Sequence, residues 1–132
     1  MACTETFSTL RIHSSNISPD EISHILGIDA TQISVKDPES KYKPVRDGNY
    51  WAFCTEKKIT SQNNNEHIQF ILDNISDKSE LLDNLRLRGC KTDISNYWTS
   101  NGQGGPSISL EIMQSLLKYK LPIYWDMYFD DE

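Results

Sequence analysis

Three histidines and three cysteines are the side chains best suited to bind a metal ion or to act as nucleophiles. They are His13, His24, His67, Cys3, Cys54 and Cys90. No two histidines lie at helical ligand spacing, and the sequence has no Cys-x-x-Cys motif and no Gly-x-Ser-x-Gly elbow. The sparse, odd set of cysteines predicts no disulfide framework, and Cys54 and Cys90 are interpreted as small buried hydrophobic residues. We therefore expect no metal site, no cofactor and no catalytic residue.

A glycine-rich loop, Gly102-Gln103-Gly104-Gly105, precedes a predicted helix and could present backbone amides to a phosphate. It lacks the Lys-Ser/Thr of a P-loop, and its third glycine is misplaced for a dinucleotide-binding fingerprint. Pro106 also removes an amide. We interpret the segment as a surface turn, and a small-molecule-binding enzyme that uses this loop is the alternative. Residues 37–49 carry interleaved basic and acidic side chains and are predicted to form a solvated loop.

The segment from Ile123 to Phe129 gives the clearest indication of a binding surface. In a strand, alternate side chains point to opposite faces of the sheet. The expected core face carries Ile123, Trp125, Met127 and Phe129, and the opposite face carries Tyr124, Asp126 and Tyr128. Tyr50 and Tyr97 precede tryptophans and are expected on the same opposite face. Tyrosine is enriched at protein interfaces, although half-buried cross-strand pairs are the alternative interpretation.

Acidic side chains surround this predicted surface. Asp126, Asp130 and Asp131 lie on or just after the last predicted strand, and the chain has a net charge of −6. An acidic surface repels phosphate groups, so we expect neither nucleic acid nor an anionic membrane as a partner. A basic protein would suit this charge. The alternative is that the charge only improves solubility.

These residues would be positioned by a single α+β domain over residues 1–132. The expected order is β-α-β-β-α-α-β-α-β, with about five strands in one antiparallel or mixed sheet and helices mainly on one face. Leu10 and Ile12 alternate in the first strand, and Ser18 is a typical N-cap for the first helix, which Gly27 ends.

The later helices are indicated by apolar spacing and by capping residues. One follows the apolar residues from His67 to Ile75, and Asp77 is predicted to cap the next. The last helix is expected to start near Ser109 and to bury Ile112, Met113, Leu116 and Leu117. No apolar stretch approaches the roughly 20 residues of a membrane span, and the N-terminus has no secretory signal pattern. These features predict a cytoplasmic protein.

The chain resembles the bacterial domain-of-unknown-function family 4279 over nearly its whole length. The resemblance rests on Leu10-Arg11-Ile12, on the segment from Ser18 to Ile28, on Gly48 and Trp51, and on the helix end from Leu85 to Gly89. The glycine-rich loop, the helix from Ser109 and Asp126-Met127-Tyr128 complete it. The polar run Ser61 to Asn65 departs from the pattern. The resemblance implies a small cytosolic bacterial domain and no particular reaction.

The sequence therefore predicts a protein-binding module. The most specific form of this prediction is an immunity protein that neutralises a basic toxin domain. Its predicted partner-binding residues are Tyr50, Tyr97, Tyr124, Asp126, Tyr128, Asp130 and Asp131. The alternatives are a homodimer or other homo-oligomeric structural domain, which would use the same face, and the enzyme described above.

Overall fold

The computed structural model describes residues 3–130, which form one five-stranded sheet and five helices. The strands are β1 (Cys3–Ser14), β2 (Gln32–Ser34), β3 (Asn49–Cys54), β4 (Lys91–Ser100) and β5 (Ile123–Phe129). The helices are α1 (Pro19–Leu26), α2 (Lys43–Asp47), α3 (Asn64–Asn74), α4 (Ser79–Leu87) and α5 (Leu110–Tyr119). Apart from α2, this is the predicted order of elements.

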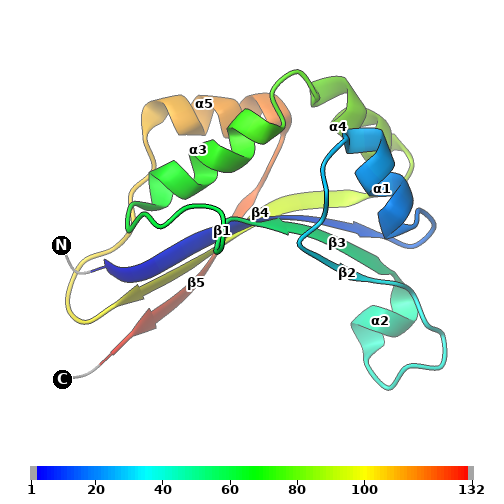
Figure 1. The fold of residues 1–132 in the computed structure, drawn as a ribbon, viewed down its shortest axis with the longest axis horizontal. Coiled ribbons are helices and arrows are strands. Elements are labelled where there is room, and N and C mark those ends of the chain that lie inside the picture. The colour runs from blue at the N-terminus through cyan, green and yellow to red at the C-terminus, as the bar shows by residue number, and fades with distance from the viewer. Residues whose placement is uncertain (1–2, 131–132) are drawn as a thin grey trace.

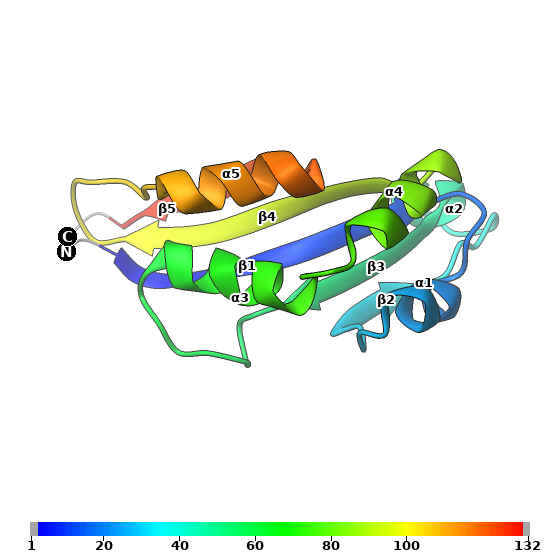
Figure 2. The same cartoon turned by 90° about the horizontal axis from the view of Figure 1, so that it is seen from above.

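The sheet is mixed, with strand order β2-β3-β1-β4-β5. All neighbouring strands are antiparallel except β4 and β5, which are parallel because α5 returns the chain to the starting end of β4. α1, α3, α4 and α5 cover one face of the sheet, whereas α2 projects on the other side (Figures 1 and 2). The predicted α+β class and the predicted helical layer on one face are confirmed.

The core lies between the sheet and this helical layer. Alternation in the strands directs Leu10, Ile12, Trp51 and Ile94 towards the helices, and each of these side chains is fully buried. The indole nitrogen of Trp51 donates a hydrogen bond to the hydroxyl of Ser23 in α1, 2.8 Å away, and so fixes that helix on the sheet. The alternate side chains of the same strands point away from the helices and form the other face of the sheet.

Serine caps begin two of the helices as predicted. The Ser18 hydroxyl accepts a hydrogen bond from the Glu21 amide at 3.1 Å, and the Ser109 hydroxyl accepts one from Ile112 at 3.2 Å. The Glu21 carboxylate accepts a hydrogen bond at 2.9 Å from Arg88, which directly follows α4. The predicted end of α1 is also confirmed, because Gly27 adopts a left-handed conformation with φ of 65°.

The polar run from Ser61 to Asn65 does more than connect two elements. Asn63 caps α3 by accepting a hydrogen bond from the Asn65 amide. The side chain of Asn64 donates to the carbonyl of Ser107, and that of Asn65 accepts from the Ser109 amide. These bonds join the start of α3 to the start of α5, so the polar residues place two helices relative to each other.

Several local predictions were wrong. The predicted loop 37–49 contains α2, whose five residues are too few to produce a helical apolar period. Asp77 is not the cap of α4, because it turns the chain with φ of 65° and the helix starts two residues later. Met113 and Leu117 are exposed, since only Ile112, Leu116 and Tyr119 of α5 are buried. Met127 and Phe129 are likewise exposed on the helical side of β5.

Candidate functional site

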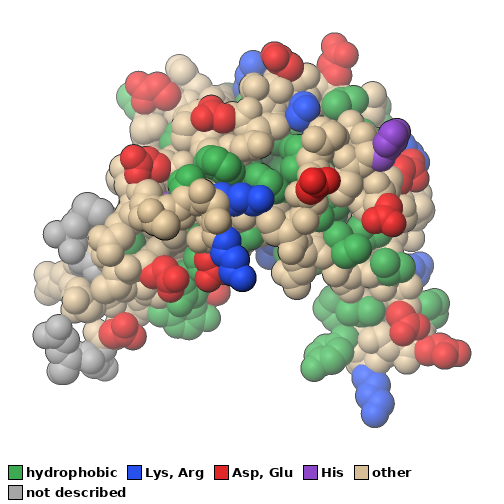
Figure 3. All heavy atoms as spheres, in the orientation of Figure 1, with side chains coloured by type: hydrophobic (Ala, Val, Ile, Leu, Met, Phe, Trp, Pro, Cys, Tyr) green, Lys and Arg blue, Asp and Glu red, His purple; other side chains and the backbone are tan. Residues whose placement is uncertain are grey.

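The candidate site is the open face of the sheet, defined as the face opposite α1, α3, α4 and α5. Strand register places its side chains in rows that run across the sheet. One row contains Tyr50, His13 and Lys91, and the next contains Arg11 and Asp93. Further along, the rows are Thr9, Ser95 and Tyr124, then Phe7, Tyr97 and Asp126. The molecule is hollowed below this face, and the segment around α2 projects at one end (Figure 3).

Aromatic rings cluster where β1, β4 and β5 meet. Phe7 and Tyr97 are stacked, with ring centroids 4.7 Å apart and an interplanar angle of 15°. Tyr128 lies against Tyr97 at 5.7 Å. Tyr124, on the same strand as Tyr128, is 54% exposed. We call this group, Phe7, Tyr97, Tyr124 and Tyr128, the tyrosine end of the open face.

A hollow of about 630 Å³ lies beside the tyrosine end and is partly acidic. Tyr97 and Tyr128 line it together with Glu5 and Asp130. A hydrogen bond that the Tyr128 phenol donates to the Asp126 carboxylate raises the pKa of that phenol. Two phenol rings beside two carboxylates can accommodate a cation through both ring faces and ion pairing.

Arg11 joins the two ends of the open face. Its Nε donates to Oδ1 of Asp93 at 2.6 Å, and its guanidinium carbon lies 5.9 Å from the centre of the Tyr124 ring. The Arg11 side chain is 29% exposed and that of Asp93 is 15% exposed, so the ion pair is partly shielded from water. Arg11 also lines the cavity at the other end of this face.

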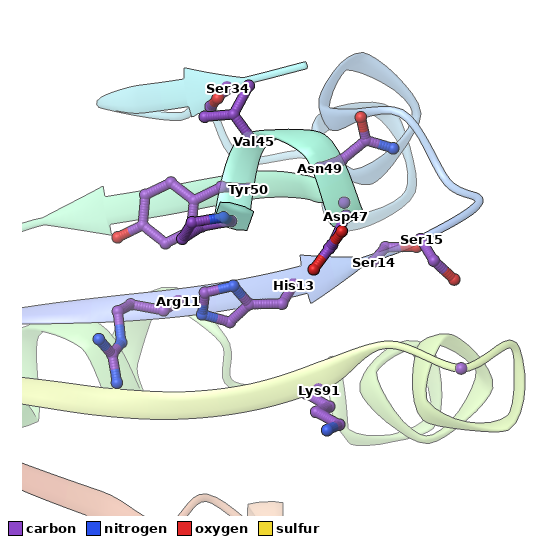
Figure 4. Close-up of a pocket in the computed structure, with 13 residues that line it drawn as sticks. Arg11, His13, Ser14, Ser15, Ser34, Val45, Asp47, Asn49, Tyr50 and Lys91 are labelled. Carbon is purple, nitrogen blue, oxygen red and sulfur yellow. The ribbon is translucent and has the colours of Figure 1, made fainter. Parts of the chain in front are cut away.

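At that other end, α2 lies over the sheet and a cavity of about 670 Å³ separates them (Figure 4). We call it the α2 pocket. Its lining includes Arg11, His13, Tyr50, Val45, Asp47 and Lys91. The rings of His13 and Tyr50 are 5.1 Å apart and tilted by 48°. This end is therefore partly enclosed, whereas the tyrosine end is open.

Burial changes the acidity of the two aromatic side chains in the α2 pocket. Burial is the main cause of the lowered pKa of His13. The charges of Arg11 and Lys91 lower this pKa further, and the charge of Asp93 opposes the shift. Burial also raises the pKa of the Tyr50 phenol. Both groups are therefore held in their neutral forms at neutral pH, so they can exchange hydrogen bonds without adding charge.

The structure separates the predicted partner-binding residues into two groups. It brings Tyr97, Tyr124, Asp126 and Tyr128 together, with Asp130 following directly at the end of β5. Tyr50 lies at the far end of the open face because β3 pairs with β1 and not with β4. Asp131 lies outside the described residues. All four tyrosines lie on the predicted face, but Tyr50 is separate from the group that the other three form.

Sequence reasoning did not select Phe7, Arg11, His13 or Lys91, which complete the open face. The signal for two of them was present, because Arg11 and His13 alternate with the buried Leu10 and Ile12. Their partners across the sheet could not be found in the same way, since strand order is decided by contacts between distant segments.

His67, Cys90 and Cys54 differ in burial and in their hydrogen-bond partners. The Thr55 hydroxyl lies 2.6 Å from Nδ1 of the buried His67, and Nε2 of His67 lies 2.7 Å from the Ser61 carbonyl, so both ring nitrogens have partners. Cys90 is buried as predicted, and burial raises the pKa of its thiol. Cys54 is only half-buried, because it faces the open side of β3. Within residues 3–130, no cluster of three histidine, cysteine, aspartate or glutamate side chains could hold a metal ion.

Comparison with known proteins gives a family and no activity. No helix in the described part of the chain has the length and apolar character that a membrane span requires. The comparison with curated proteins finds no significant match, and neither does the comparison with solved structures. A family model matches residues 4–130, nearly the whole chain. The chain therefore belongs to the family described as domain of unknown function (DUF4279).

Proposed function

We propose that the protein is a protein-binding module whose partner docks on the surface formed by α5 and β5. One observation carries the proposal. Of the eleven exposed large hydrophobic side chains among residues 3–130, seven lie on these two elements. They are Leu110, Met113, Leu117, Tyr124, Met127, Tyr128 and Phe129. Exposed apolar side chains that are concentrated on two elements, and not scattered singly, are typical of interaction sites.

The position of β5 in the sheet supports the same surface. β5 is an edge strand, and within the described residues it pairs only with β4. An edge strand has backbone donors and acceptors along its free side, to which a partner can add a strand. Tyr124 and Tyr128 flank that free edge on one sheet face, and Met127 and Phe129 flank it on the other. A partner at this edge would bury apolar area on both sides.

Charge favours a basic partner. The chain has a net charge of −6, and the tyrosine end is bordered by Glu5, Asp126 and Asp130. A lysine or arginine of the partner would contact the rings of Tyr97 and Tyr128 and these carboxylates together. In its most specific form, the proposal is that the protein is an immunity protein that covers a basic toxin domain.

The cysteines bear on location. Cys3, Cys54 and Cys90 are free, which supports a cytoplasmic location because reducing compartments disfavour disulfides.

Self-association through β5 is the less favoured alternative. Asp126 is the middle residue of the seven-residue strand, so full antiparallel pairing of two β5 strands would set two Asp126 carboxylates opposite each other. Like charges at directly opposed positions destabilise a strand pair. The same carboxylate would stabilise a foreign strand that carries lysine or arginine at that point.

Co-expression with the reading frame adjacent to the gene in its own genome tests the proposal. We expect the neighbouring product to be basic, to inhibit growth alone, and to form a complex with this protein that restores growth. Tyr124→Ala with Tyr128→Ala should weaken the complex at least a hundredfold, since interface tyrosines are often dominant contacts. Tyr42→Ala is the matched control, because Tyr42 is 75% exposed but lies on the α2 segment.

Two results would contradict the proposal. One is a neighbour that causes no growth defect and forms no complex. The other is a complex whose affinity is the same for the Tyr124/Tyr128 double variant and for Tyr42→Ala. Charge complementarity is checked on the same complex, because its affinity should decrease with added salt and decrease less steeply after Glu5→Gln with Asp130→Asn.

A further inference from the structure

The α2 pocket has the size and lining of a small-molecule site. Its volume of about 670 Å³ lies within the roughly 300–1,000 Å³ that is usual for ligand pockets. The sheet forms one wall, with Arg11, His13 and Tyr50, and α2 forms the other, with Pro44 and Val45 (Figure 4). The pocket is distinct from the tyrosine end, since none of Phe7, Tyr97, Tyr124 and Tyr128 lines it.

α2 does not pack against the sheet that it faces. None of its five residues is buried, so no apolar core contact holds it in place. Local polar bonds do so instead: the Asp37 amide donates to the Val45 carbonyl at 2.8 Å, and the Lys36 amide donates to Oδ1 of Asn49 at 2.7 Å. A helix held away from an aromatic wall by its own loop leaves room for a flat apolar group between Val45 and the rings of His13 and Tyr50.

The charges of the pocket leave one cation without a carboxylate partner. Arg11 is paired with Asp93, and Asp47 is paired with Lys43 at 2.5 Å. Lys91 lines the pocket from the start of β4 and takes part in no ion pair among residues 3–130. Ser34 and Tyr50 line the other side of the pocket, across β1 from Lys91, so Lys91 is the charged group that remains available. In an acidic protein, this is a local site for one negative charge.

We propose that the α2 pocket binds a small aromatic monocarboxylate, with its ring between Val45 and the His13–Tyr50 pair and its carboxylate at Lys91. One free cation matches one carboxylate. A phosphate monoester dianion would retain an uncompensated charge in a site that Asp47 also lines. This site is additional to the protein-binding surface and does not depend on it.

Benzoate is the probe that tests the site, with benzamide as its uncharged analogue. Titration of the full-length protein, followed by calorimetry and by backbone amide shifts, should give a benzoate Kd of about 1 mM or lower, as expected for a fragment-sized ligand. The shifts should concentrate on Val45, Tyr50 and Lys91. Benzamide should bind at least tenfold more weakly, because it cannot form the ion pair with Lys91.

Variants assign the binding to the pocket. Lys91→Ala should weaken benzoate binding at least tenfold, and Lys118→Ala should leave it unchanged, because Lys118 lies on α5, on the opposite side of the sheet from the pocket. Val45→Ser should weaken benzoate and benzamide equally, since it removes apolar contact and no charge. The proposal is wrong if benzoate does not bind at tens of millimolar, or if it binds Lys91→Ala and the parent protein equally well.

Discussion

The two ends of the open sheet face differ in what lies over them, although the same strand β1 runs through both. At the tyrosine end, nothing in the described part of the chain covers Tyr124 and Tyr128, which are 54% and 52% exposed. At the α2 pocket, a five-residue helix stands over His13 and Tyr50 and encloses a cavity. An open aromatic surface suits a macromolecule, which is large enough to exclude water from it. A partly enclosed cavity suits a small ligand, because the pocket walls bury most of the ligand surface.

This difference arises from the connections between strands and not from the strands themselves. The link from β4 to β5 contains α5, which packs on the opposite face and leaves the open face bare. The link from β2 to β3 is an antiparallel connection whose residues fold into α2 on the open side. Two functions can therefore be tested separately on one face, because each end depends on a different connection.

The largest effect is expected from removing a buried side-chain contact that supplements the backbone pairing of β5 with β4. Asn96 is fully buried: Oδ1 accepts from the Ser8 hydroxyl at 2.6 Å, and Nδ2 donates to the Tyr124 carbonyl at 3.1 Å. Asn96→Ala leaves both partners unsatisfied and should lower the free energy of unfolding by about 2–3 kcal/mol. Urea denaturation measures the change, with Ser95→Ala as the control that stays within about 0.5 kcal/mol.

The same variant should affect the two ends unequally. Amide hydrogen exchange in β5 should accelerate more than exchange in β3, because the lost bond to Tyr124 anchors β5 alone. Equal acceleration in both strands would mean that the ends are not independent, and would weaken the comparison above.

The next largest effect is expected at Arg11, which contacts both ends. Arg11→Met leaves the Asp93 carboxylate, 15% exposed, without its partner and removes the cation from the Tyr124 ring. We expect a loss of about 1–2 kcal/mol in unfolding free energy, reduced by the partial exposure of Arg11. Arg88→Met is the control, since the Arg88–Glu21 pair is nearly half exposed on both sides and should contribute little. Equal losses in the two variants would show that Arg11 does not link the ends.

Much of this architecture could be predicted from the sequence because its signals are local. Ser18 and Ser109 cap helices through bonds that span three residues, and alternation in β1 identifies Leu10 and Ile12 as core residues. The bounds of the last strand, Ile123 to Phe129, are those predicted. Such features need no knowledge of the rest of the chain.

The errors concern properties that distant segments decide. Met113 and Leu117 have the spacing of buried residues, yet nothing among residues 3–130 covers that side of α5. Tyr50 was grouped with Tyr97 because both precede tryptophans, but the strand order places β1 between them. The α2 pocket was missed because Val45 and Lys91 are far apart in sequence and only the folded sheet brings them to one cavity.

The pH dependence of the unfolding free energy should report on His13, which lies at the pocket end of the open face. Burial lowers the pKa of His13 in the folded state, so between the folded and unfolded pKa values the unfolded chain binds more protons. His13 therefore contributes stability above its unfolded pKa, and this contribution is lost as pH falls through the folded pKa. Urea unfolding from about pH 7.5 to about pH 5 should show a shallower decline for His13→Gln than for the parent protein. Parallel curves would show that His13 is not shielded from water by the pocket.

The smallest effect on stability is expected from Val45→Ser, and this is what makes it informative. α2 buries none of its residues, so removing the Val45 side chain should change the unfolding free energy by less than about 0.5 kcal/mol. Ile71→Val, at a fully buried position in α3, should cost about 1 kcal/mol and shows that such changes can be measured. A loss from Val45→Ser as large as that from Ile71→Val would mean that α2 packs on the sheet in solution. The cavity would then be closed to a ligand, and the contrast between the two ends of the open face would disappear.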